Sequence, residues 1–466
     1  MMAVPRLAWD GTLASLPPEW PEDPLPDIRN HVTQRREKII VVDDDPMGVQ
    51  ASFNVTVLMD WSLDTLVDDF RFNTRPTFIV ANTRGMSAAT AKRTVDEIAH
   101  NVANAARMIE HPLVIIGRGD STLRGHYFEE SKSLAAGMNL ENAPLVLAPF
   151  FFEGGRVTID DIHYVVEDNE LIPAGQSEFA KDATFGYSKS RLQEWVAEKT
   201  LGAIKPDEVC SISLDTIRKG GPRAVMEALC SLQPNSMCIT NAVTMRDIQV
   251  VALGSIRAEE KGHHAVWKTA ASFINARAGI GSADLIQPAI LDLPQDRGGL
   301  IIVGSHTPRT NRQLECLLNL CDVSPVEIDI DKLLSNDQEL TSVLRSINRN
   351  LRAGVDTVIF TSRRLVTSDS KEKNLLLSAQ ISDKLALILQ EVYRPKYMIV
   401  KGGMTSYDIA TKSLRAKGAL ALGQILPGIP IWQLDAESSA PGMTFIPFPG
   451  NQGTATSLSD LLTILK

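Results

Sequence analysis

Three consecutive aspartates, Asp43-Asp44-Asp45, directly follow an apolar run at residues 39–42. Adjacent carboxylates repel one another, so they destabilise the chain unless cations or hydroxyl donors lie nearby. Such a cluster could recognise a hydroxyl group, deprotonate it as a general base, or hold magnesium. It could also be a solvated acidic turn in which one aspartate caps a helix. Its position directly after an apolar strand favours a functional role.

A second polar group lies at residues 117–126, which read Gly-Arg-Gly-Asp-Ser-Thr-Leu-Arg-Gly-His. A planar guanidinium group can hold a carboxylate through two hydrogen bonds. The segment therefore predicts a site for a polyol that carries a carboxylate, although a capped helix with surface arginines would also fit it. Its carboxylate, hydroxyl and guanidinium groups belong to Asp120, Ser121, Thr122, Arg118 and Arg124.

Two glycine-containing turns lie in the second half of the chain, at residues 304–308 and 401–406. In the first, Thr307 is expected to cap a helix whose first residue is Pro308. In the second, Thr405 and an aspartate three residues later have the spacing of a capping box. Glycines let the backbone approach an anion closely, so the two turns together predict binding of nucleotide phosphate.

A third glycine turn, at residues 449–453, could also bring the backbone close to a ligand, or could simply reverse the chain. The common phosphate-binding and metalloprotease signatures are absent from the sequence. There is no Gly-x-x-x-x-Gly-Lys-[Ser/Thr] loop, and Gly279-x-Gly281 lacks the third glycine of a dinucleotide fingerprint. A kinase with this sequence would belong to none of the common classes.

The elements that must position these groups follow from the apolar pattern. Short apolar runs stop abruptly at polar or small residues, as buried parallel strands do. Residues 95–109 repeat apolar side chains at spacings of three and four, which predicts an amphipathic crossover helix. In open α/β sheets, ligands bind beyond the carboxyl ends of the strands, so the polar groups should meet there. The predicted strands lie at residues 39–42, 78–80, 113–116, 145–147, 237–240, 300–303, 358–360 and 397–400.

The run of strands restarts near residue 300, which predicts two α/β domains. Each is expected to contain a mainly parallel sheet flanked by helices, with the active site in the cleft between the domains. The proline-rich N-terminus cannot bury a core, so it should form an arm that lies on the first domain or on a partner subunit. The predicted divisions are 1–38 for the arm, 39–290 for the first domain, 291–299 for a linker and 300–466 for the second domain.

Composition disfavours several kinds of partner. The formal net charge of the 466 residues is −9, whereas a nucleic-acid-binding surface normally carries a basic excess. No apolar run approaches the roughly 18 residues of a membrane span, and the N-terminus lacks a secretory signal. A cytoplasmic protein is therefore predicted. The five cysteines form no CxxC pair, which disfavours zinc or disulfides, and no metal ligand is assigned.

The sequence resembles the four-carbon acid sugar kinases, whose members phosphorylate threonate, erythronate or 3-oxo-tetronate. The resemblance extends from Ile39 to about Leu462 and is most specific at residues 43–50, 120–125 and 402–406. In that family the N-terminal domain binds the sugar acid and the C-terminal domain binds ATP. The resemblance therefore implies ATP and Mg²⁺ as cofactors, and a sugar acid as the substrate.

The family's functional residues are carried over only where the motifs match. The implied catalytic residues are Asp44, Asp45 and Asp120. The implied substrate-binding residues are Asp43, Arg84, Arg118, Ser121 and Arg124. The implied nucleotide-binding residues are Ser305, Gly402, Gly403, Met404, Thr405 and Gly450.

The sequence departs from the family pattern at three positions. Met47 replaces the usual threonine after the aspartates, Arg118-Gly119 replaces a lysine, and Tyr407 stands where many members have glycine. Because the carboxylates, Arg124 and the Gly-Gly-x-Thr turn are intact, the departures bear on the choice of substrate rather than on phosphoryl transfer.

The predicted reaction transfers phosphate from ATP to the C4 hydroxyl of a four-carbon sugar acid. Arginines would hold the carboxylate, and one aspartate would orient the attacking hydroxyl. One alternative is a non-catalytic nucleotide- and sugar-acid-binding protein; another is an aspartyl phosphatase, because Asp43-x-Asp45 mimics the acidic pair of that fold. The features are also compatible with a homodimer.

Overall fold

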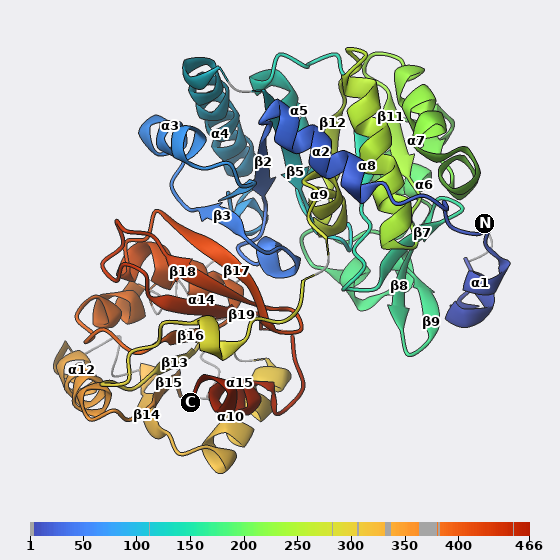
Figure 1. The fold of residues 1–466 in the computed structure, drawn as a ribbon. Coiled ribbons are helices and arrows are strands. Elements are labelled where there is room, and N and C mark those ends of the chain that lie inside the picture. Colours follow the sequence, from blue (N-terminus) through green and yellow to red (C-terminus); the bar gives the residue numbers. More distant parts are fainter. Residues whose placement is uncertain are drawn as a thin grey trace. The chain divides into compact units, whose positions relative to one another are not determined.

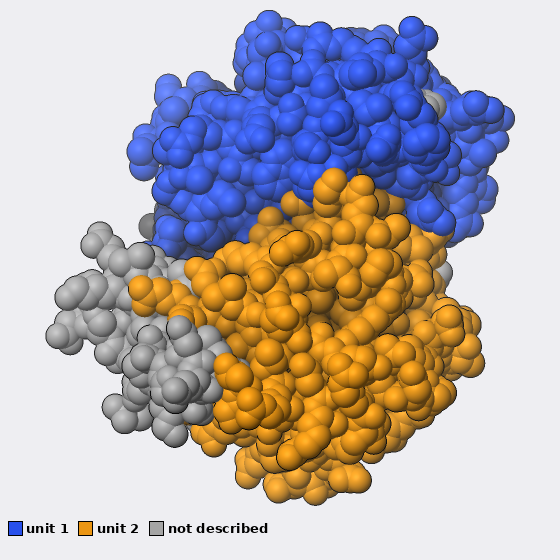
Figure 2. Space-filling model, turned by 90° about the vertical axis from the view of Figure 1, so that its left-hand side faces the viewer, with its two compact units in different colours: residues 1–48, 60–282 blue, residues 49–59, 283–466 orange. Residues whose placement is uncertain are grey.

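The chain folds into two compact units, coloured separately in Figure 2. The first comprises residues 1–48 and 60–282, and the second comprises residues 49–59 and 283–466. Residues 49–59 thus belong with the C-terminal part of the chain, whereas the sequence predicts an unbroken first domain. The computed structural model describes residues 4–110, 112–281, 283–304, 307–330, 337–362, 380, 383–450 and 452–466.

The first unit is built on a parallel sheet (Figure 1). All its adjacent described strands run parallel, which confirms the predicted strands of the N-terminal half. Residues of β2 and β4 are buried throughout, as expected for apolar strands covered on both faces. In sheet order the strands are β10 (Val209–Ile212), β11 (Met237–Thr240), β6 (Leu145–Ala148), β12 (Val266–Thr269), β5 (Leu113–Arg118), β2 (Lys38–Asp43) and β4 (Thr77–Val80).

Helices connect these strands in two directions across the sheet. α4 (Ala88–Ile109) leads from β4 to β5, and α5 (Tyr127–Gly137) leads from β5 to β6. α7 (Leu214–Cys230) and α8 (Met245–Glu259) run back, from β10 through β11 to β12. Because crossovers between parallel strands are right-handed, the two pairs of helices cover opposite faces of the sheet.

Helix α4 confirms the amphipathic helix predicted at residues 95–109. It buries Val95, Ile98 and Val102 on one face, and the side chain of Ser87 caps its first turn. Further helical segments of this unit are α3 (Leu63–Phe72), α6 (Leu192–Lys199), η2 (Thr83–Gly85), η3 (Ala174–Gln176), η4 (Glu178–Lys181) and η5 (Pro206–Glu208).

A small antiparallel sheet accompanies the parallel one in the first unit. It was not predicted, because its strands are short and partly polar. Its order is β1 (Leu7–Ala8), β9 (Glu170–Pro173), β8 (Ile162–Glu167) and β7 (Arg156–Ile159).

The N-terminal arm lies on the first unit, in agreement with one of the two predicted placements. Its strand β1 pairs with β9, and α1 (Trp9–Ser15) follows. Its second helix, α2 (Leu25–Arg35), packs against α8 and α9 (Ala271–Arg277), as Figure 1 shows. The Arg29 Nε donates a hydrogen bond of 2.8 Å to the carbonyl of Gly279, so the arm is fixed by polar as well as apolar contacts.

The second unit contains a mixed sheet. Its four strands β16, β13, β15 and β14 are parallel neighbours, which confirms the predicted runs near residues 300, 358 and 397. β19 is parallel to β16, but β3, β17 and β18 pair antiparallel. In sheet order the strands are β3 (Val55–Leu58), β17 (Gly418–Leu426), β18 (Ile429–Leu434), β19 (Thr444–Phe448), β16 (Met398–Lys401), β13 (Leu300–Val303), β15 (Thr357–Thr361) and β14 (Ser324–Ile328).

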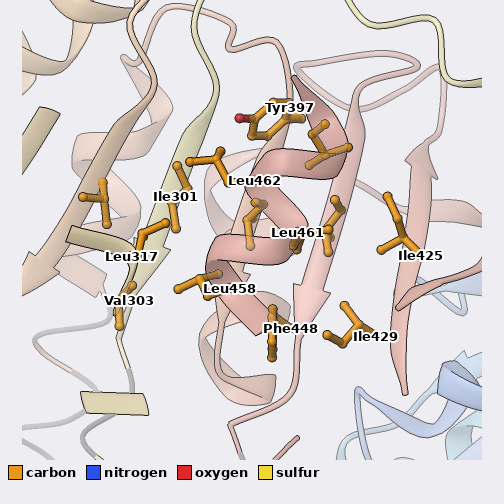
Figure 3. Packing of buried hydrophobic residues seen from close by; sticks show 14 of the residues in the cluster. Ile301, Val303, Leu317, Tyr397, Ile425, Ile429, Phe448, Leu458, Leu461 and Leu462 are labelled. Atoms are coloured by element: carbon orange, nitrogen blue, oxygen red, sulfur yellow. The ribbon is translucent and has the colours of Figure 1, made fainter. Parts of the chain in front are cut away.

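The core of the second unit forms where α15 packs on this sheet (Figure 3). Leu458, Leu461 and Leu462 of α15 have no exposed surface, and they face Ile301 and Phe448 of the strands. Burying one leucine side chain contributes about 1.5–3 kcal/mol, so this helix is a major source of stability for the unit. The described helices of this unit include α10 (Pro308–Leu320), α12 (Asp337–Arg352), α14 (Gly403–Asp408) and α15 (Ser457–Leu465). Across both units, none of the described helices has the length and apolar character needed to cross a membrane.

Candidate functional site

The predicted substrate-side residues meet at the carboxyl ends of neighbouring strands in the first unit. Asp43 ends β2 and Arg118 ends β5, and the parallel register places these two residues opposite one another. On the other side of β2, β4 leads into η2, which carries Arg84. We call the following residues the aspartate–arginine cluster: Asp43, Asp44, Asp45, Arg84, Arg118, Asp120 and Arg124.

Arg84 bridges two of the three consecutive aspartates. Its Nη2 lies 2.7 Å from Asp44 Oδ1, and its Nη1 lies 2.6 Å from Asp45 Oδ2. Burial by itself would raise the pKa of Asp45, but Arg84 and Arg118 bring that pKa below its usual value. The repulsion expected among adjacent carboxylates is therefore offset by guanidinium groups, which supports the functional interpretation of the acidic run.

Asp43 is the most deeply buried of the three. Its Oδ1 lies 3.2 Å from Arg118 Nη1, and its Oδ2 has no hydrogen-bond partner among the described residues. Burial raises the pKa of Asp43 to about 7, against the opposing effect of Arg118. A Cβ atom at Gly48 would collide with the Asp43 carboxyl group, so this position in the turn requires glycine.

Asp120 has one carboxylate oxygen occupied and one open. Its Oδ2 accepts hydrogen bonds from Arg124 Nε, at 2.7 Å, and from the hydroxyl of Thr122. Its Oδ1 lies 3.9 Å from Arg84 Nη1, which is within ion-pair range but too long for a hydrogen bond. Burial alone would raise the pKa of Asp120, yet Arg84 and Arg124 hold it well below its usual range. Asp120 is thus an ionised carboxylate that can accept one more hydrogen bond.

Two tyrosines fix the loop that carries Asp120. The Tyr127 hydroxyl donates to the Asp120 carbonyl at 2.5 Å, and the Tyr187 hydroxyl donates to the Thr122 carbonyl at 2.8 Å. Directly after these two carbonyl groups, Leu123 has a φ of 67°, a conformation that few non-glycine residues adopt. The loop therefore keeps a strained residue next to carbonyl groups that two buried tyrosine side chains hold in place.

A buried histidine supports the same loop and was not predicted as a site residue. His163 Nε2 lies 2.7 Å from the carbonyl oxygen of Ser121, and its Nδ1 lies 2.9 Å from Thr158 Oγ1. Burial lowers the pKa of His163 to about 4, so the ring is neutral at physiological pH. Ser121, which follows Asp120 of the cluster, is thus a buried residue whose carbonyl is anchored.

Lys268 and Glu130 form a buried ion pair beneath the cluster, which sequence reasoning also missed. Lys268 Nζ lies 2.5 Å from Glu130 Oε2 and donates to the carbonyl of Arg118 at 3.1 Å. Lys268 also favours the charged form of Asp44, whose pKa is nevertheless raised by burial. In the sequence, Lys268 is only a lysine within a short apolar segment. That pattern does not indicate whether the side chain lies in a functional site or is exposed to solvent.

The predicted nucleotide-side residues meet in the second unit, at the ends of β13, β16 and β19. These strands are parallel neighbours, and they are followed by Gly304, Gly402 and, one residue further on, Gly450. A Cβ atom at Gly304 would lie 2.8 Å from Thr405 Oγ1, so the first two turns are in close contact. Ser305, which was predicted to contact nucleotide, lies outside the described residues.

Helix α10 begins as predicted. The side chain of Thr307 accepts a hydrogen bond of 3.2 Å from the backbone N–H of Thr310, and Pro308 is the first helical residue. The hydroxyls of both threonines lie 3.4 Å from the carbonyl oxygen of Gly450. These contacts join the turn after β19 to the start of the helix after β13.

The capping box predicted at Thr405 is wrong. α14 begins at Gly403, and Gly402 precedes it with a φ of 126° and no side-chain capping bond. A positive φ suits glycine, so the chain enters the helix before Thr405, which then lies within its first turn. Met404, also predicted to contact nucleotide, has a side chain that is 52% exposed.

Lys401 connects two of these turns from inside the unit. Its side chain is fully buried, and its Nζ donates to the carbonyl of Pro449 at 2.5 Å. The same Nζ lies 3.9 Å from the centre of the Phe448 ring. Burial lowers the pKa of Lys401 to about 7. Its role in holding β16 and β19 together could not be predicted from a lysine that precedes two glycines.

The side chains that could bind a metal ion indicate how magnesium could be held. In the part of the chain that the structure describes, no group of three or more histidine, cysteine, aspartate or glutamate side chains is placed to bind a metal ion. The aspartates of the first unit pair with arginines instead. This arrangement fits a magnesium ion that is carried by nucleotide phosphates, with at most one or two protein ligands.

Two family models match the chain, one in each half. A model described as "Sugar-binding N-terminal domain" matches residues 39–277, and one described as "Nucleotide-binding C-terminal domain" matches residues 300–458. This chain belongs to the family with the four-carbon acid sugar kinase architecture. In this chain, the part matched by the sugar-binding model contains the aspartate–arginine cluster, and the part matched by the nucleotide-binding model contains the three glycine turns. No curated protein matches the chain.

Solved structures show the same fold at low sequence identity. The Haemophilus influenzae protein HI1011 has a TM-score of 0.65 and 15% identity, over 92% of this chain and 100% of that one. A Salmonella typhimurium LT2 protein named "putative tRNA synthase" also has a TM-score of 0.65 and 15% identity, over 91% and 98% of the two chains. At this identity the two structures confirm the α/β fold of this chain and nothing finer.

Proposed function

We propose that this protein transfers the γ-phosphoryl group of ATP to a hydroxyl of a four-carbon sugar acid. The observation that carries the proposal is Asp120, an ionised and largely buried carboxylate with one oxygen, Oδ1, lacking a hydrogen-bond donor within the described residues. In a domain that matches a sugar-binding family, a substrate hydroxyl is the natural donor to this oxygen.

The cations of the cluster suit an anionic sugar. Arg84 and Arg124 are partly exposed, with 19% and 23% of their side chains accessible, and both lie beside Asp120. An arginine that already holds a carboxylate on one edge can still offer its other N–H groups to a substrate. We assign Arg124, assisted by Arg84 or Arg118, to the substrate carboxylate, and this assignment favours an acid over a neutral sugar.

The nucleotide would be held in the other domain by the turns at Gly304, Gly402 and Gly450. The three glycines have no side chain that would block the approach of phosphate to backbone N–H groups. When bound with ATP, magnesium would neutralise phosphate charge. Transfer requires the two domains to bring the substrates together and to exclude water.

In the reaction, a substrate hydroxyl oxygen forms a bond to the γ-phosphorus while the bond to the β,γ-bridging oxygen breaks and ADP leaves. Asp120 Oδ1 accepts a hydrogen bond from the hydroxyl and orients it, and the hydroxyl proton passes to solvent as the bond to phosphorus forms. Asp44 and Asp45 hold Arg84 in position beside it. The terminal C4 hydroxyl is the preferred acceptor, because it is the least hindered and lies farthest from the carboxylate.

The test is an ADP-release assay over D- and L-threonate, D- and L-erythronate and the 3-oxo acid, with the phosphorylated position read by NMR. We expect turnover with at least one of them and phosphate on C4. Turnover with hexoses or six-carbon acids alone would refute the four-carbon assignment. Calorimetric binding of ADP and a tetronate without turnover would identify a binding protein, and phosphate release without nucleotide would identify a phosphatase.

A further inference from the structure

Two arginines of the first unit lie against one aromatic ring. Phe179, in η4, has Arg124 Cζ 5.2 Å from its ring centre and Arg156 Cζ at the same distance. Arg156 is the first residue of β7, and its backbone N–H and carbonyl both bond to Phe151, at 2.9 and 3.0 Å. The backbone of Arg156 is therefore fixed, while its side chain points to the same ring as an arginine of the cluster.

Of the two arginines that lie against this ring, Arg124 has an aspartate partner and Arg156 has no carboxylate partner among the described residues. Each arginine of the aspartate–arginine cluster has an aspartate within 3.2 Å: Arg84 has Asp44, Arg118 has Asp43 and Arg124 has Asp120. Arg156 has no carboxylate within ion-pair distance in the described part of the chain, and its Nε is buried without a hydrogen-bond partner. The residue as a whole is partly exposed.

An unpaired guanidinium group in such a place is costly. Burial lowers the pKa of Arg156, and the positive charge of Arg124 lowers it further, while Asp120 and Glu167 only partly compensate. Arginine nevertheless remains charged in proteins. An anion bound here would remove the repulsion between the two guanidinium groups, and Phe179 would shield the contact from water on one side.

We propose that Arg156 receives the carboxylate of the sugar-acid substrate, with Arg124 as the second arm of the same site. This inference rests on the proposed function and adds a specificity residue to it. The assignment adds an arginine that no described aspartate holds to a site in which Arg84, Arg118 and Arg124 are each paired with an aspartate. The free fork of Arg156 matches a carboxylate through two parallel hydrogen bonds.

The experiment compares acids with neutral sugars in binding, so that it does not depend on turnover. The affinities of D-threonate and D-erythronate, and of the neutral polyols threitol and erythritol, are measured by calorimetry for the natural protein and for Arg156→Met. Loss of a charge-assisted contact should weaken acid binding by roughly 30- to 1,000-fold. Binding of the neutral polyols should stay within a few-fold of the natural protein.

Two further variants control for folding and for charge. Arg156→Lys keeps the charge but loses the fork, so it should restore part of the acid affinity. Arg191→Met removes another arginine of the same unit, one that donates to the Asp160 carbonyl at 3.0 Å, and it should leave both affinities unchanged.

The outcomes separate this inference from the proposed function. Unchanged acid binding in Arg156→Met would overturn the inference, and so would an equal loss for acids and polyols, because Arg156 would then support the fold rather than read the carboxylate. If the natural protein bound no four-carbon acid, the proposed function itself would fall.

Discussion

Asp43 is a carboxyl group with no exposed surface, one unpartnered oxygen and a pKa of about 7. Its carboxyl group sits directly against Gly48. Such a group is maintained at a cost in stability, and that cost depends on pH. The cost can be measured independently of any catalytic activity.

Replacing Asp43 with asparagine should change how the free energy of unfolding depends on pH. The folded-state pKa of about 7 lies above the ordinary value of 3.8, so the folded protein binds more protons between these values. The contribution of Asp43 to stability therefore falls as pH rises through this range, by up to about 4 kcal/mol. Urea titrations should show Asp43→Asn gaining stability relative to the natural protein from pH 4 to pH 7.

Asp45→Asn is the matched control, because the folded-state pKa of Asp45 is lowered rather than raised. The stabilising effect of Asp45 is present above the ordinary aspartate pKa and is lost only as pH falls below it. The difference between this variant and the natural protein should therefore be constant from pH 5 to pH 7. Parallel pH profiles for Asp43→Asn and the natural protein would contradict a raised pKa at Asp43.

Asp120→Asn tests the proposed hydroxyl acceptor. The amide keeps the size of the side chain but loses the negative charge that orients the hydroxyl and favours loss of its proton, so kcat should fall by about 10²- to 10⁴-fold. ATP affinity, measured with a non-hydrolysable analogue, should stay unchanged because Asp120 lies in the sugar-binding domain. A kcat within a few-fold of the natural value would remove Asp120 from the mechanism.

At the scale of elements, the parallel strands could be predicted because each is a short apolar run that ends at a polar or small residue. β2 and β13 are examples, and their ends carry Asp43 and Gly304 as predicted. β7 and β17 were not predicted, since Arg156, Thr158 and Gly423 interrupt the apolar pattern. Strand ends therefore located most of the candidate site, while residues that enter from β7, β8 and β12 remained unassigned.

The sequence could not predict which charged side chains pair with one another, and the reason is different. The sequence shows that Arg118, Arg124 and Arg156 are present, but only their positions in space show which of them an aspartate already holds. Sequence spacing suggested Arg118 and Arg124 for an anionic ligand. The pairing found in the structure adds Arg156, on an antiparallel strand, to the candidates.

The turn after β16 provides a test of nucleotide binding at the level of an element. A valine at Gly403 would place a branched side chain where the backbone is expected to approach phosphate. Loss of one such hydrogen bond should raise the Kd for an ATP analogue by about tenfold, as measured by calorimetry. Gly403→Ala adds one methyl group and should change the Kd only a few-fold. If Gly403→Val bound the analogue normally, the turn would not contact phosphate.

At the scale of the whole molecule, the division of the chain differs from the one predicted from the run of apolar strands. Residues 49–59 follow the acidic motif in sequence, yet β3 pairs with β17 in the second unit. Nothing in the apolar pattern of this short strand indicates which sheet it joins, because pairing partners are set by the tertiary fold. A contiguous boundary near residue 290 therefore could not include it.

Ligand-dependent melting can check this division of the chain. Val57 of β3 and Val41 of β2 are both fully buried, and an aspartate at either position would cost several kcal/mol. Val57→Asp should abolish the thermal stabilisation by an ATP analogue while sugar-acid stabilisation persists, and Val41→Asp should do the reverse. Loss of sugar-acid stabilisation alone in Val57→Asp would contradict the assignment of β3 to the second unit.

The placement of residues 49–59 in the second unit also has a consequence during protein synthesis. β3 leaves the ribosome hundreds of residues before β17, the strand with which it pairs. At roughly 5–20 residues per second, β3 must wait about 20–70 s for its partner. During that interval the first unit can close only with this segment looped out, and the unpaired strand is open to mispairing with other chains. Chaperone dependence of this protein should therefore be concentrated in the time before residue 426 is made.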